Sequence, residues 1–291
     1  MSDSSALPSP YYPRISVVIP ARNEARNLEV ILPWLPAVHQ VILVDGSSVD
    51  GTVEVARRVM PSIDVVHQTR SGKGNALACG FAAATGDIIV MFDADGSADS
   101  AEIPAFVAAL TAGADVAKGS RFRPGGGSED ITRFRGLGNH GLNFLTNVLL
   151  RTRYTDLCYG YNAFWRDILP SLDLPDVNRP KRSDGKMIWG DGFEIETILT
   201  CRMAAARLTV TEVPSVEKLR IHGASNLNAI RDGFRVLKTI LDEHRRARRG
   251  HVPVPIERHN RTELEMRHRE HDRIHETEMS VRLKNSREHA A

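Results

Sequence analysis

Short β-rich runs alternate with helical patterns through the first 120 residues, and this alternation limits the fold more than any other feature. The runs cover residues 15–20, 41–44, 63–66, 88–92 and 114–118. They are too short for helices, and each is followed by a helical pattern or a turn. Strands that alternate with helices are typical of a parallel sheet with helices on both faces. The sequence therefore predicts an α/β fold with a Rossmann-like, mostly parallel central sheet flanked by helices.

The second half of the chain is less regular. Helical patterns cover 137–150, 191–206 and 229–249, and one further strand is expected at 208–213. Loops are expected at 121–130, 176–188 and 220–226, and an aromatic-rich stretch runs from 154 to 165. With 291 residues, 42% of them hydrophobic, the chain can bury a core in one large domain or two small ones.

Charge and cysteine content exclude several classes of protein. The formal net charge is only +2, so no nucleic-acid partner is expected. The three cysteines are scattered without metal-ligand spacing, which fits a reducing compartment. No apolar stretch approaches the roughly 18 to 20 residues that span a bilayer. The sequence predicts a soluble or peripheral protein.

Polar residues cluster where the predicted strands end. Each follows a strand directly or lies in a strand-to-helix loop. These residues are Asn23, Glu24, Asp45, Lys73, Asp93 and Asp95. In open α/β sheets ligands bind at the carboxyl ends of the strands, so the sequence predicts a binding site at this edge. The alternative is that the polar side chains only cap helices and turns.

Asp93 and Asp95 follow a buried strand and are separated by one small residue. Mg²⁺ is usually bound through one or two carboxylates plus the phosphates of a substrate. The pair therefore indicates a metal that neutralises charge on a departing diphosphate. An ordinary Asp-rich turn is the other interpretation.

Other polar groups fit the same kind of ligand. Glu24 and Asp45 suit hydrogen bonds from a nucleobase or ribose, or simple capping. The glycine-rich segment 71–74 precedes a helix and carries Lys73, an arrangement that meets phosphate in some proteins. It lacks both the full phosphate-loop spacing and the dinucleotide fingerprint, so a simple turn remains open. Arg121 can bind phosphate bidentately or form a surface ion pair.

Two regions of the second half carry further candidates. Asp191 and Glu194 lie at a helix start, where Asp191 can cap the helix and Glu194 can interact with its dipole. His222 lies in the loop 220–226 beside Arg220. Its imidazole can ligate a metal, bind phosphate, or be an ordinary loop histidine.

In combination, these segments resemble the family 2 glycosyltransferases, which have the GT-A nucleotide-sugar fold. Residues 19–24 (Ile-Pro-Ala-Arg-Asn-Glu) are similar to the family's opening Pro-x-x-Asn-Glu. Residues 44–52 (Val-Asp-Gly-Ser-Ser-Val-Asp-Gly-Thr) are similar to its Val-Asp-Asp-Gly-Ser-x-Asp-Gly-Thr, and residues 93–95 to its metal-binding Asp-x-Asp. The resemblance runs from about 15 to 242. It is greatest to the polyprenyl-phosphate (dolichyl-phosphate) mannose or glucose synthases.

The resemblance implies a role for each matching residue. The implied donor-binding residues are Pro20, Asn23, Glu24, Asp45, Lys73, Asp93 and Arg121. The implied acceptor- or phosphate-binding residues are Arg135, Asp156, Arg220 and Ser225. Asp93 and Asp95 would hold Mg²⁺ or Mn²⁺. Gly46 stands where the family usually has a second Asp, and Ser97 replaces a frequent Gln or His, so His222 or water would complete the metal shell.

The predicted activity is metal-dependent, inverting transfer of a hexose from a nucleotide diphosphate sugar of the GDP-mannose or UDP-glucose type. The predicted acceptor is a polyprenyl phosphate, which needs no general base. A soluble hydroxyl acceptor, as in the similar glucosyl-3-phosphoglycerate synthases, is the alternative, and Asp191 or Glu194 would then take its proton. A nucleotidyltransferase and a nucleotide-sugar-binding module without turnover are further alternatives.

Composition, charge and the extent of the resemblance divide the chain into four parts. We expect a disordered leader at 1–13, a nucleotide-sugar-binding half at 14–122 and an acceptor-binding half of the same domain at 123–249. A charged helical or disordered C-terminal extension follows at 250–291. From residue 245 onward, twelve Arg and Lys outnumber eight Asp and Glu. The predicted location is cytoplasmic, with peripheral contact of this tail with the inner face of the membrane and homo-oligomerisation as open alternatives.

Overall fold

The computed structural model describes residues 13–223 and 229–250. Apart from Pro13, the described residues belong to one compact unit that has a central sheet with helices packed around it. The predicted leader at 1–13, save for Pro13, and the predicted tail, save for Gly250, lie outside the described residues. The predicted division near residue 122 stays a prediction.

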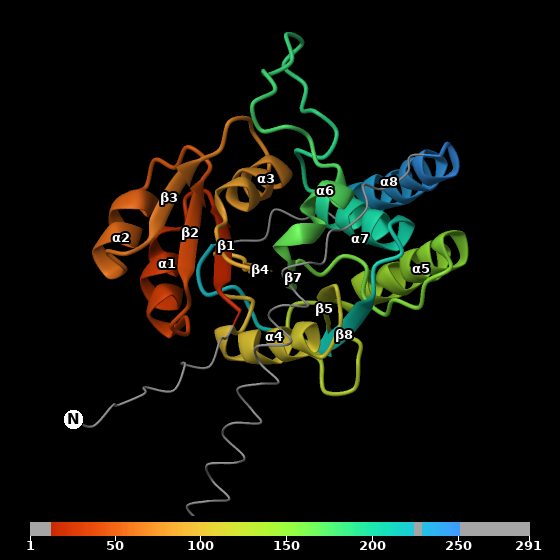
Figure 1. Ribbon diagram of the computed structural model, residues 1–291, viewed down its shortest axis with the longest axis horizontal. Helices are drawn as coiled ribbons and strands as arrows, with labels where there is room; N and C mark the ends of the chain where they lie inside the picture. The colour runs from red at the N-terminus through yellow and green to blue at the C-terminus, as the bar shows by residue number, and fades with distance from the viewer. Residues whose placement is uncertain (1–12, 224–228, 251–291) are drawn as a thin grey trace, which may run out of the picture. The chain divides into compact units, whose positions relative to one another are not determined.

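A seven-stranded sheet forms the centre of the molecule (Figure 1), and its strand order is β3-β2-β1-β4-β7-β5-β8. The strands are β1 (Ile15–Ala21), β2 (Gln40–Asp45), β3 (Asp64–His67), β4 (Ile88–Met91), β5 (Val116–Ser120), β7 (Asn162–Trp165) and β8 (Val210–Pro214). Every neighbouring pair is parallel except the two that include β7. The predicted mostly parallel sheet is confirmed.

The strand β7 was not predicted from the sequence. It lies within the aromatic-rich stretch and runs antiparallel between β4 and β5, with Ala163 opposite both Val90 and Ala117. All four residues of β7 are buried, so the strand shows no alternation of apolar and polar side chains. It therefore lies between the parallel strands β3-β2-β1-β4 on one side and the parallel pair β5-β8 on the other.

In the first half of the chain, helices follow the strands β1, β2, β3 and β4, as the alternating pattern predicts. The first four are α1 (Ala25–Ile31), α2 (Thr52–Val59), α3 (Lys73–Ala83) and α4 (Ile103–Thr111), with short 3-10 turns at η1 (Leu32–Trp34) and η2 (Ser100–Glu102). Helix α3 packs against β1, β2 and β3, and α4 packs against β5, β7 and β8. Strands β1, β2 and β4 are largely apolar and buried, which is the pattern of a sheet covered on both faces, whereas the edge strands β3 and β8 are more exposed.

The C-terminal helices form a second packed group (Figure 1). They are α5 (Arg133–Leu150), α6 (Leu169–Leu172), α7 (Ile195–Ala205) and α8 (Ala229–Arg248), with η3 (Arg166–Ile168) before α6. Leu157, Cys201 and Ile240 are the buried centre of this group, and Leu145 and Val236 pack against them. Helix α7 was predicted to begin at Asp191 but begins at Ile195, because the segment before it is held by side-chain and tertiary contacts described below.

Two short strands, β6 (Gly127–Ser128) and β9 (Val216–Glu217), pair in parallel outside the main sheet. Their pairing ties the glycine-rich loop after β5 to the segment after β8. In the described part of the chain, no helix is both long enough and apolar enough to cross a bilayer.

Candidate functional site

Three neighbouring strands end at the same edge of the sheet and carry the predicted site residues there. β1 leads into Asn23 and Glu24, β2 ends at Asp45, and β4 leads into Asp93. The register pairs the last residues of β1 and β2. Because these strands are parallel, their carboxyl ends lie together, and the acidic side chains predicted from the sequence are gathered at one place.

Asp93 is held by Lys73 at the start of α3. The Lys73 Nζ lies 2.8 Å from Asp93 Oδ1 and 2.7 Å from Glu196 Oε1 on α7. One ammonium therefore bridges two carboxylates that come from opposite halves of the chain. A Cβ added to Gly160 would lie 3.3 Å from Asp93 Oδ2, 3.4 Å from the ammonium and 3.5 Å from Glu196 Oε1, so the residue-160 backbone lies directly over this group.

The electrostatics of this group follow from its burial. Burial raises the pKa of Asp93, Lys73 lowers it, and the nearby Asp95 carboxylate raises it again, so that the pKa of Asp93 lies above its usual value. Burial alone would lower the pKa of Lys73, but Asp93 and Glu196 raise it above its usual range. Lys73 therefore stays protonated and offsets the negative charge of Asp93 and Glu196.

Asp95 is held by Arg220, from the loop after β9. The Arg220 Nη2 lies 2.9 Å from Asp95 Oδ2, and its Nη1 lies 3.0 Å from Glu24 Oε1. The other oxygen of Asp95 accepts hydrogen bonds from the Ser97 backbone N–H at 3.0 Å and from its hydroxyl at 2.7 Å. Arg220 thus joins the predicted base-binding and metal-binding acids, and Ser97 fixes the orientation of the Asp95 carboxylate.

Backbone contacts hold the Arg220 loop against the loop that carries Asp95. The Ile221 N–H donates to the Asp95 carbonyl at 3.0 Å, and the Lys218 N–H donates to the Ser97 carbonyl at 2.8 Å. Gly96 has a φ of +80°, and a Cβ there would lie 2.4 Å from Ile221 Cδ1. Glycine is needed at this position for both reasons.

The loops after β1 and β2 are tied to each other. Asn23, at a φ of +58°, accepts the Val49 N–H at its Oδ1 at 2.9 Å. Asp45 is buried, and Oδ2 of its carboxylate accepts the Ser47 N–H at 3.0 Å. A Cβ added to Gly46 would lie 3.1 Å from the Cβ of Arg22, so a larger residue there would have to displace a neighbour. An Asp at this position, which the resembling family usually has, would require Arg22 or Ala21 to shift by a few tenths of an ångström.

Arg121 forms a buried ion pair. Its Nε and Nη2 lie 2.7 Å and 2.9 Å from the two oxygens of Asp156, and its Nη1 lies 3.0 Å from Glu217 Oε2. Burial would lower the pKa of Arg121, but these carboxylates raise it above its usual range. The roles of Arg121 and Asp156 in binding phosphate stay predictions, and the geometry shows them holding each other. Arg135 forms a separate ion pair with Asp130 at 2.9 Å.

The glycine-rich turn at 71–74 packs against the backbone of residues 190–191. A Cβ on Gly72 would lie 2.1 Å from the Asp191 carbonyl oxygen, and one on Gly74 would lie 1.9 Å from that of Gly190. The Asn75 N–H at the start of α3 donates to the Asp191 carbonyl at 3.1 Å. Close approach of two backbones therefore explains these glycines, and it brings Lys73 to the site.

The two candidate general bases are both engaged. Asp191 is buried and receives two hydrogen bonds from Arg70, Nε to Oδ2 at 2.7 Å and Nη2 to Oδ1 at 2.9 Å. Glu194 folds back, and its Oε1 accepts the Gly190 and Gly192 N–H groups at 3.1 Å and 3.2 Å. Asp191 therefore pairs with an arginine from the first half of the chain. Glu194 binds the backbone of the loop 190–192, which directly precedes α7.

The remaining predicted residues are less informative. Pro20 lies in β1 opposite Val44. The backbone of His222 exchanges hydrogen bonds with the Asn27 amide, His222 N–H to Oδ1 at 2.9 Å and Nδ2 to the His222 carbonyl at 3.2 Å. Ser225 lies outside the described residues. Within residues 13–223 and 229–250, no three His, Cys, Asp or Glu side chains are grouped to hold a metal, so His222 as a ligand stays a prediction.

Sequence reasoning did not assign three residues that the structure brings into the site's ion pairs. They are Arg70, Glu196 and Glu217. Glu196 had a signal, because it follows Asp191 and Glu194 in an acidic helix start. Its partner Lys73 is far away in sequence, however, and only the folded chain identifies the pair.

Comparison with known proteins agrees with this geometry. Residues 16–172 match the family described as Glycosyl transferase family 2. A polyprenol monophosphomannose synthase of Mycolicibacterium smegmatis is 33% identical over 227 residues, which cover 74% of this chain and 81% of that protein. An uncharacterized glycosyltransferase of Mycobacterium tuberculosis is 41% identical over 107 residues; the match spans 37% of this chain and only 48% of that protein's length.

The fold also has solved counterparts. The crystal structure of a Mycobacterium tuberculosis glucosyl-3-phosphoglycerate synthase, in complex with Mn²⁺, UDP and glucosyl-3-phosphoglycerate, superposes with a TM-score of 0.61. The sequence identity is 23%, over 83% of this chain and 81% of that one, and at this level the likeness concerns the fold. The matched motifs, the parallel sheet and the acids at its carboxyl edge together identify the chain as a member of glycosyl transferase family 2.

Proposed function

We propose that this protein transfers a hexose from a nucleotide diphosphate sugar to the phosphate of a polyprenyl phosphate, with the help of a divalent metal. The observation that carries the acceptor is the engagement of both candidate bases, Asp191 by Arg70 and Glu194 by backbone N–H groups. A relative that is 33% identical over 74% of this chain, a polyprenol monophosphomannose synthase, supports the same acceptor class.

The acids at the sheet edge fit a hard divalent cation. Asp93 and Asp95 supply carboxylate oxygens, the ligand type that Mg²⁺ and Mn²⁺ prefer, and a nucleotide diphosphate would supply the remaining oxygens. With phosphate oxygens as further ligands, two protein carboxylates are enough to bind the metal. When bound, the metal would neutralise the negative charge of the diphosphate leaving group.

Lys73 and Arg220 are the cations that pair with these acids. Once a metal pairs with these acids, both side chains would be available to donate charge-assisted hydrogen bonds to the diphosphate. Arg220 also contacts Glu24, at the end of β1 where the nucleoside half would lie. The same two cations therefore neutralise acids of the chain and would also bind the donor.

The acceptor side needs no proton transfer if the nucleophile is a phosphate. A phosphate oxygen is already anionic at neutral pH, whereas a hydroxyl must lose a proton to a base in the transition state. A carboxylate that is buried and paired with a guanidinium is a weak base, because protonation would leave Arg70 unpaired. Glu196, the other acid in the site, is paired with Lys73 at 2.7 Å.

The test is a transfer assay with matched acceptors. Nucleotide sugars labelled in the sugar are incubated with Mn²⁺ and with either a polyprenyl phosphate or 3-phosphoglycerate. We expect label in the organic phase, as an acid-labile glycosyl phosphate, and none on the hydroxyl acceptor. Glu194→Gln should retain turnover within about threefold, because Gln keeps an acceptor oxygen for both N–H groups and no base is required.

Two results would contradict the proposal. Label appearing only on the soluble hydroxyl acceptor would assign the chain to the other acceptor class. A loss of turnover of about a hundredfold or more in Glu194→Gln, with unchanged thermal stability, would show that this carboxylate acts as a general base.

A further inference from the structure

Helix α5 carries an apolar face that nothing in the described structure covers. Leu137, Phe144 and Val148 expose 74%, 71% and 60% of their surface. They recur at helical spacing, and Gly141 falls in the same row. The row is therefore a continuous apolar stripe, about three turns long, and we call it the α5 stripe.

The opposite face of the same helix is already used. Leu142, Leu145 and Leu149 pack against the core formed with α7 and α8, beside Ile240. Helix α5 thus carries apolar side chains on both its buried and its exposed face. On a surface helix the exposed face is normally polar, so the α5 stripe departs from the usual pattern.

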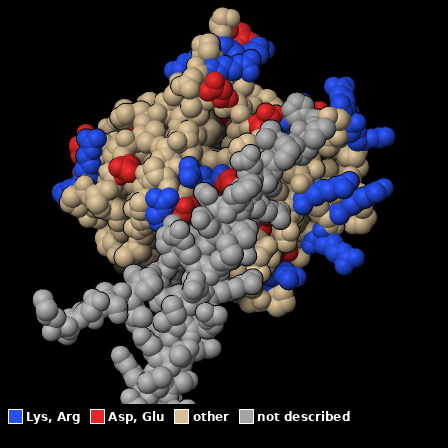
Figure 2. Space-filling view, viewed as in Figure 1, with Lys and Arg blue, Asp and Glu red and all other residues tan. Residues whose placement is uncertain are grey.

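Basic residues lie close to the stripe in sequence and on the neighbouring helix α8. The sequence from 131 to 155 contains four arginines and no Asp or Glu. Arg151 and Arg153, directly after α5, are exposed. Helix α8, which packs against α5, exposes more basic side chains along one row. They are Arg231, Lys238, Arg245, Arg248 and Arg249. Figure 2 shows Lys and Arg gathered at the edge of the molecule where Figure 1 draws α5 and α8.

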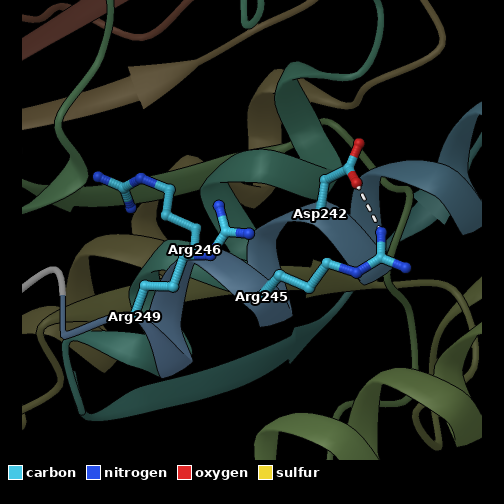
Figure 3. Close-up of a pocket in the computed structure, with 4 residues that line it drawn as sticks. All are labelled: Asp242, Arg245, Arg246 and Arg249. Carbon is cyan, nitrogen blue, oxygen red and sulfur yellow. Dashed lines mark hydrogen bonds and ion pairs between the residues drawn. The ribbon is translucent and has the colours of Figure 1, made fainter.

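The C-terminal end of α8 contains a pocket with the same character. It is lined by Asp242, Arg245, Arg246 and Arg249 (Figure 3). Asp242 is already paired with Arg245, at 3.1 Å, so the lining retains a net positive charge. An anionic headgroup matches this lining better than a neutral one.

We infer that the α5 stripe and the basic rows beside it form a docking surface for an anionic lipid bilayer. Apolar side chains on one helix face, flanked by arginine and lysine, are the pattern of a helix that lies in the plane of a membrane interface. Apolar side chains enter the boundary between headgroups and acyl chains, and the cations contact lipid phosphates.

A second copy of this chain fits the surface less well. Most homodimers are related by a two-fold axis, which places the same patch on both sides of the interface. The arginines beside the stripe would then face one another, and like charges at close range cost free energy. A nucleic acid would use the cations but would leave Leu137, Phe144 and Val148 uncovered.

The position of α5 connects the surface with the candidate site. The Asn147 side chain, on α5, donates to the Tyr154 carbonyl at 2.8 Å and accepts the Tyr154 N–H at 2.8 Å. The segment that begins there continues through Asp156 to Gly160, over the Lys73 group. The inference goes beyond the proposed function, because a chain with a soluble acceptor could carry the same surface, and its test uses no turnover.

The test is sedimentation of the full chain with phosphatidylcholine vesicles, with and without phosphatidylglycerol. The variant combines Leu137→Gln, Phe144→Gln and Val148→Gln, and the matched control combines Trp34→Gln and Val49→Gln, which replace equally exposed apolar residues elsewhere. We expect the wild type and the control to bind the anionic vesicles, less strongly as salt rises. The α5 variant should bind about tenfold more weakly or worse.

Circular dichroism should show the same melting temperature for all three proteins, because the replaced side chains are exposed. Equal vesicle binding by the α5 variant and the wild type would overturn the inference. So would a wild type that ignores vesicles but is a dimer by light scattering, with the α5 variant monomeric, because the stripe would then be an interface between copies.

Discussion

The Nη2 of Arg220 lies 2.9 Å from Oδ2 of Asp95, while Nη1 of the same guanidinium lies 3.0 Å from Oε1 of Glu24. One arginine therefore links the acid that the sequence assigns to the metal with the acid that it assigns to the nucleoside. A divalent cation at Asp95 has to compete with this guanidinium, so the charge of the Arg220 loop and occupancy of the site are coupled.

Replacement of Arg220 by Gln should separate these two effects. Asp95 would lose its internal counter-ion, so Mn²⁺ alone should bind about three- to tenfold more tightly by calorimetry, the size of effect expected for a partly exposed ion pair. Turnover should fall, because Arg220 would no longer contact the diphosphate. Arg235→Gln is the matched control, since Arg235 forms a similarly exposed ion pair with Asp232 at 2.9 Å. Unchanged Mn²⁺ affinity in Arg220→Gln would contradict the coupling.

Lys73→Met should lower stability and make it depend on metal. The change leaves Asp93 and Glu196 facing each other without a cation. Because the Asp93 side chain is 35% exposed, the loss should cost about 1 to 2 kcal/mol, less than for a fully buried pair. The melting temperature should fall, and added Mn²⁺ should restore part of it because the ion replaces the missing charge. A variant whose melting temperature does not respond to Mn²⁺ would show that Asp93 is not a metal ligand.

Gly160→Ala tests whether the space above the Lys73 group is used. The added Cβ would lie 3.3 Å from Asp93 Oδ2, close but without severe overlap. We expect a free energy of unfolding within about 1 kcal/mol of the wild type and a clear loss of donor affinity, measured by calorimetry with a nucleoside diphosphate and Mn²⁺. Gly138→Ala is the control, because nothing lies within 4 Å of its added Cβ. Equal donor affinity in the two variants would place the donor elsewhere.

The thiols of Cys158 and Cys201 should be inert in the native protein. Burial raises the pKa of each from the ordinary 9.0 to about 12. At pH 8 the thiolate fraction then falls from roughly one in ten to about one in ten thousand. Because the folded pKa is the higher one, these thiols favour the folded state below pH 9, and that contribution is lost as the pH rises from about 9 toward 12. Rapid labelling of Cys158 or Cys201 at pH 8 without denaturant would contradict the packing of α5, α7 and α8.

Much of the fold could be predicted because its signals are local. Each parallel strand of the first half is a short apolar run, and its polar exit residue marks the edge of the sheet. The strand β7 was missed because all four of its residues are buried and its neighbours β4 and β5 are remote in sequence. Helix α7 begins later than predicted because Arg70, from the first half, holds Asp191 in the preceding loop.

The site was predictable as a set of acids but not as a set of pairs. Asp93 and Asp95 stand out in the sequence because two carboxylates follow a buried strand. Their partners Lys73 and Arg220 were both singled out as phosphate ligands, and the structure shows that each also neutralises an acid. Only tertiary packing brings residues 20 to 125 positions apart into contact, so no local pattern contains this information.

The most direct test of the central claim is metal-dependent release of nucleoside diphosphate from a nucleotide sugar in the presence of polyprenyl phosphate, compared between the wild type and Asp95→Asn. We predict release by the wild type with Mn²⁺ or Mg²⁺, none after chelation, and a loss of at least about a hundredfold in Asp95→Asn. Circular dichroism should show that the variant remains folded. Metal-dependent release at the wild-type rate by folded Asp95→Asn would contradict the assignment of this carboxylate and with it the account of the site.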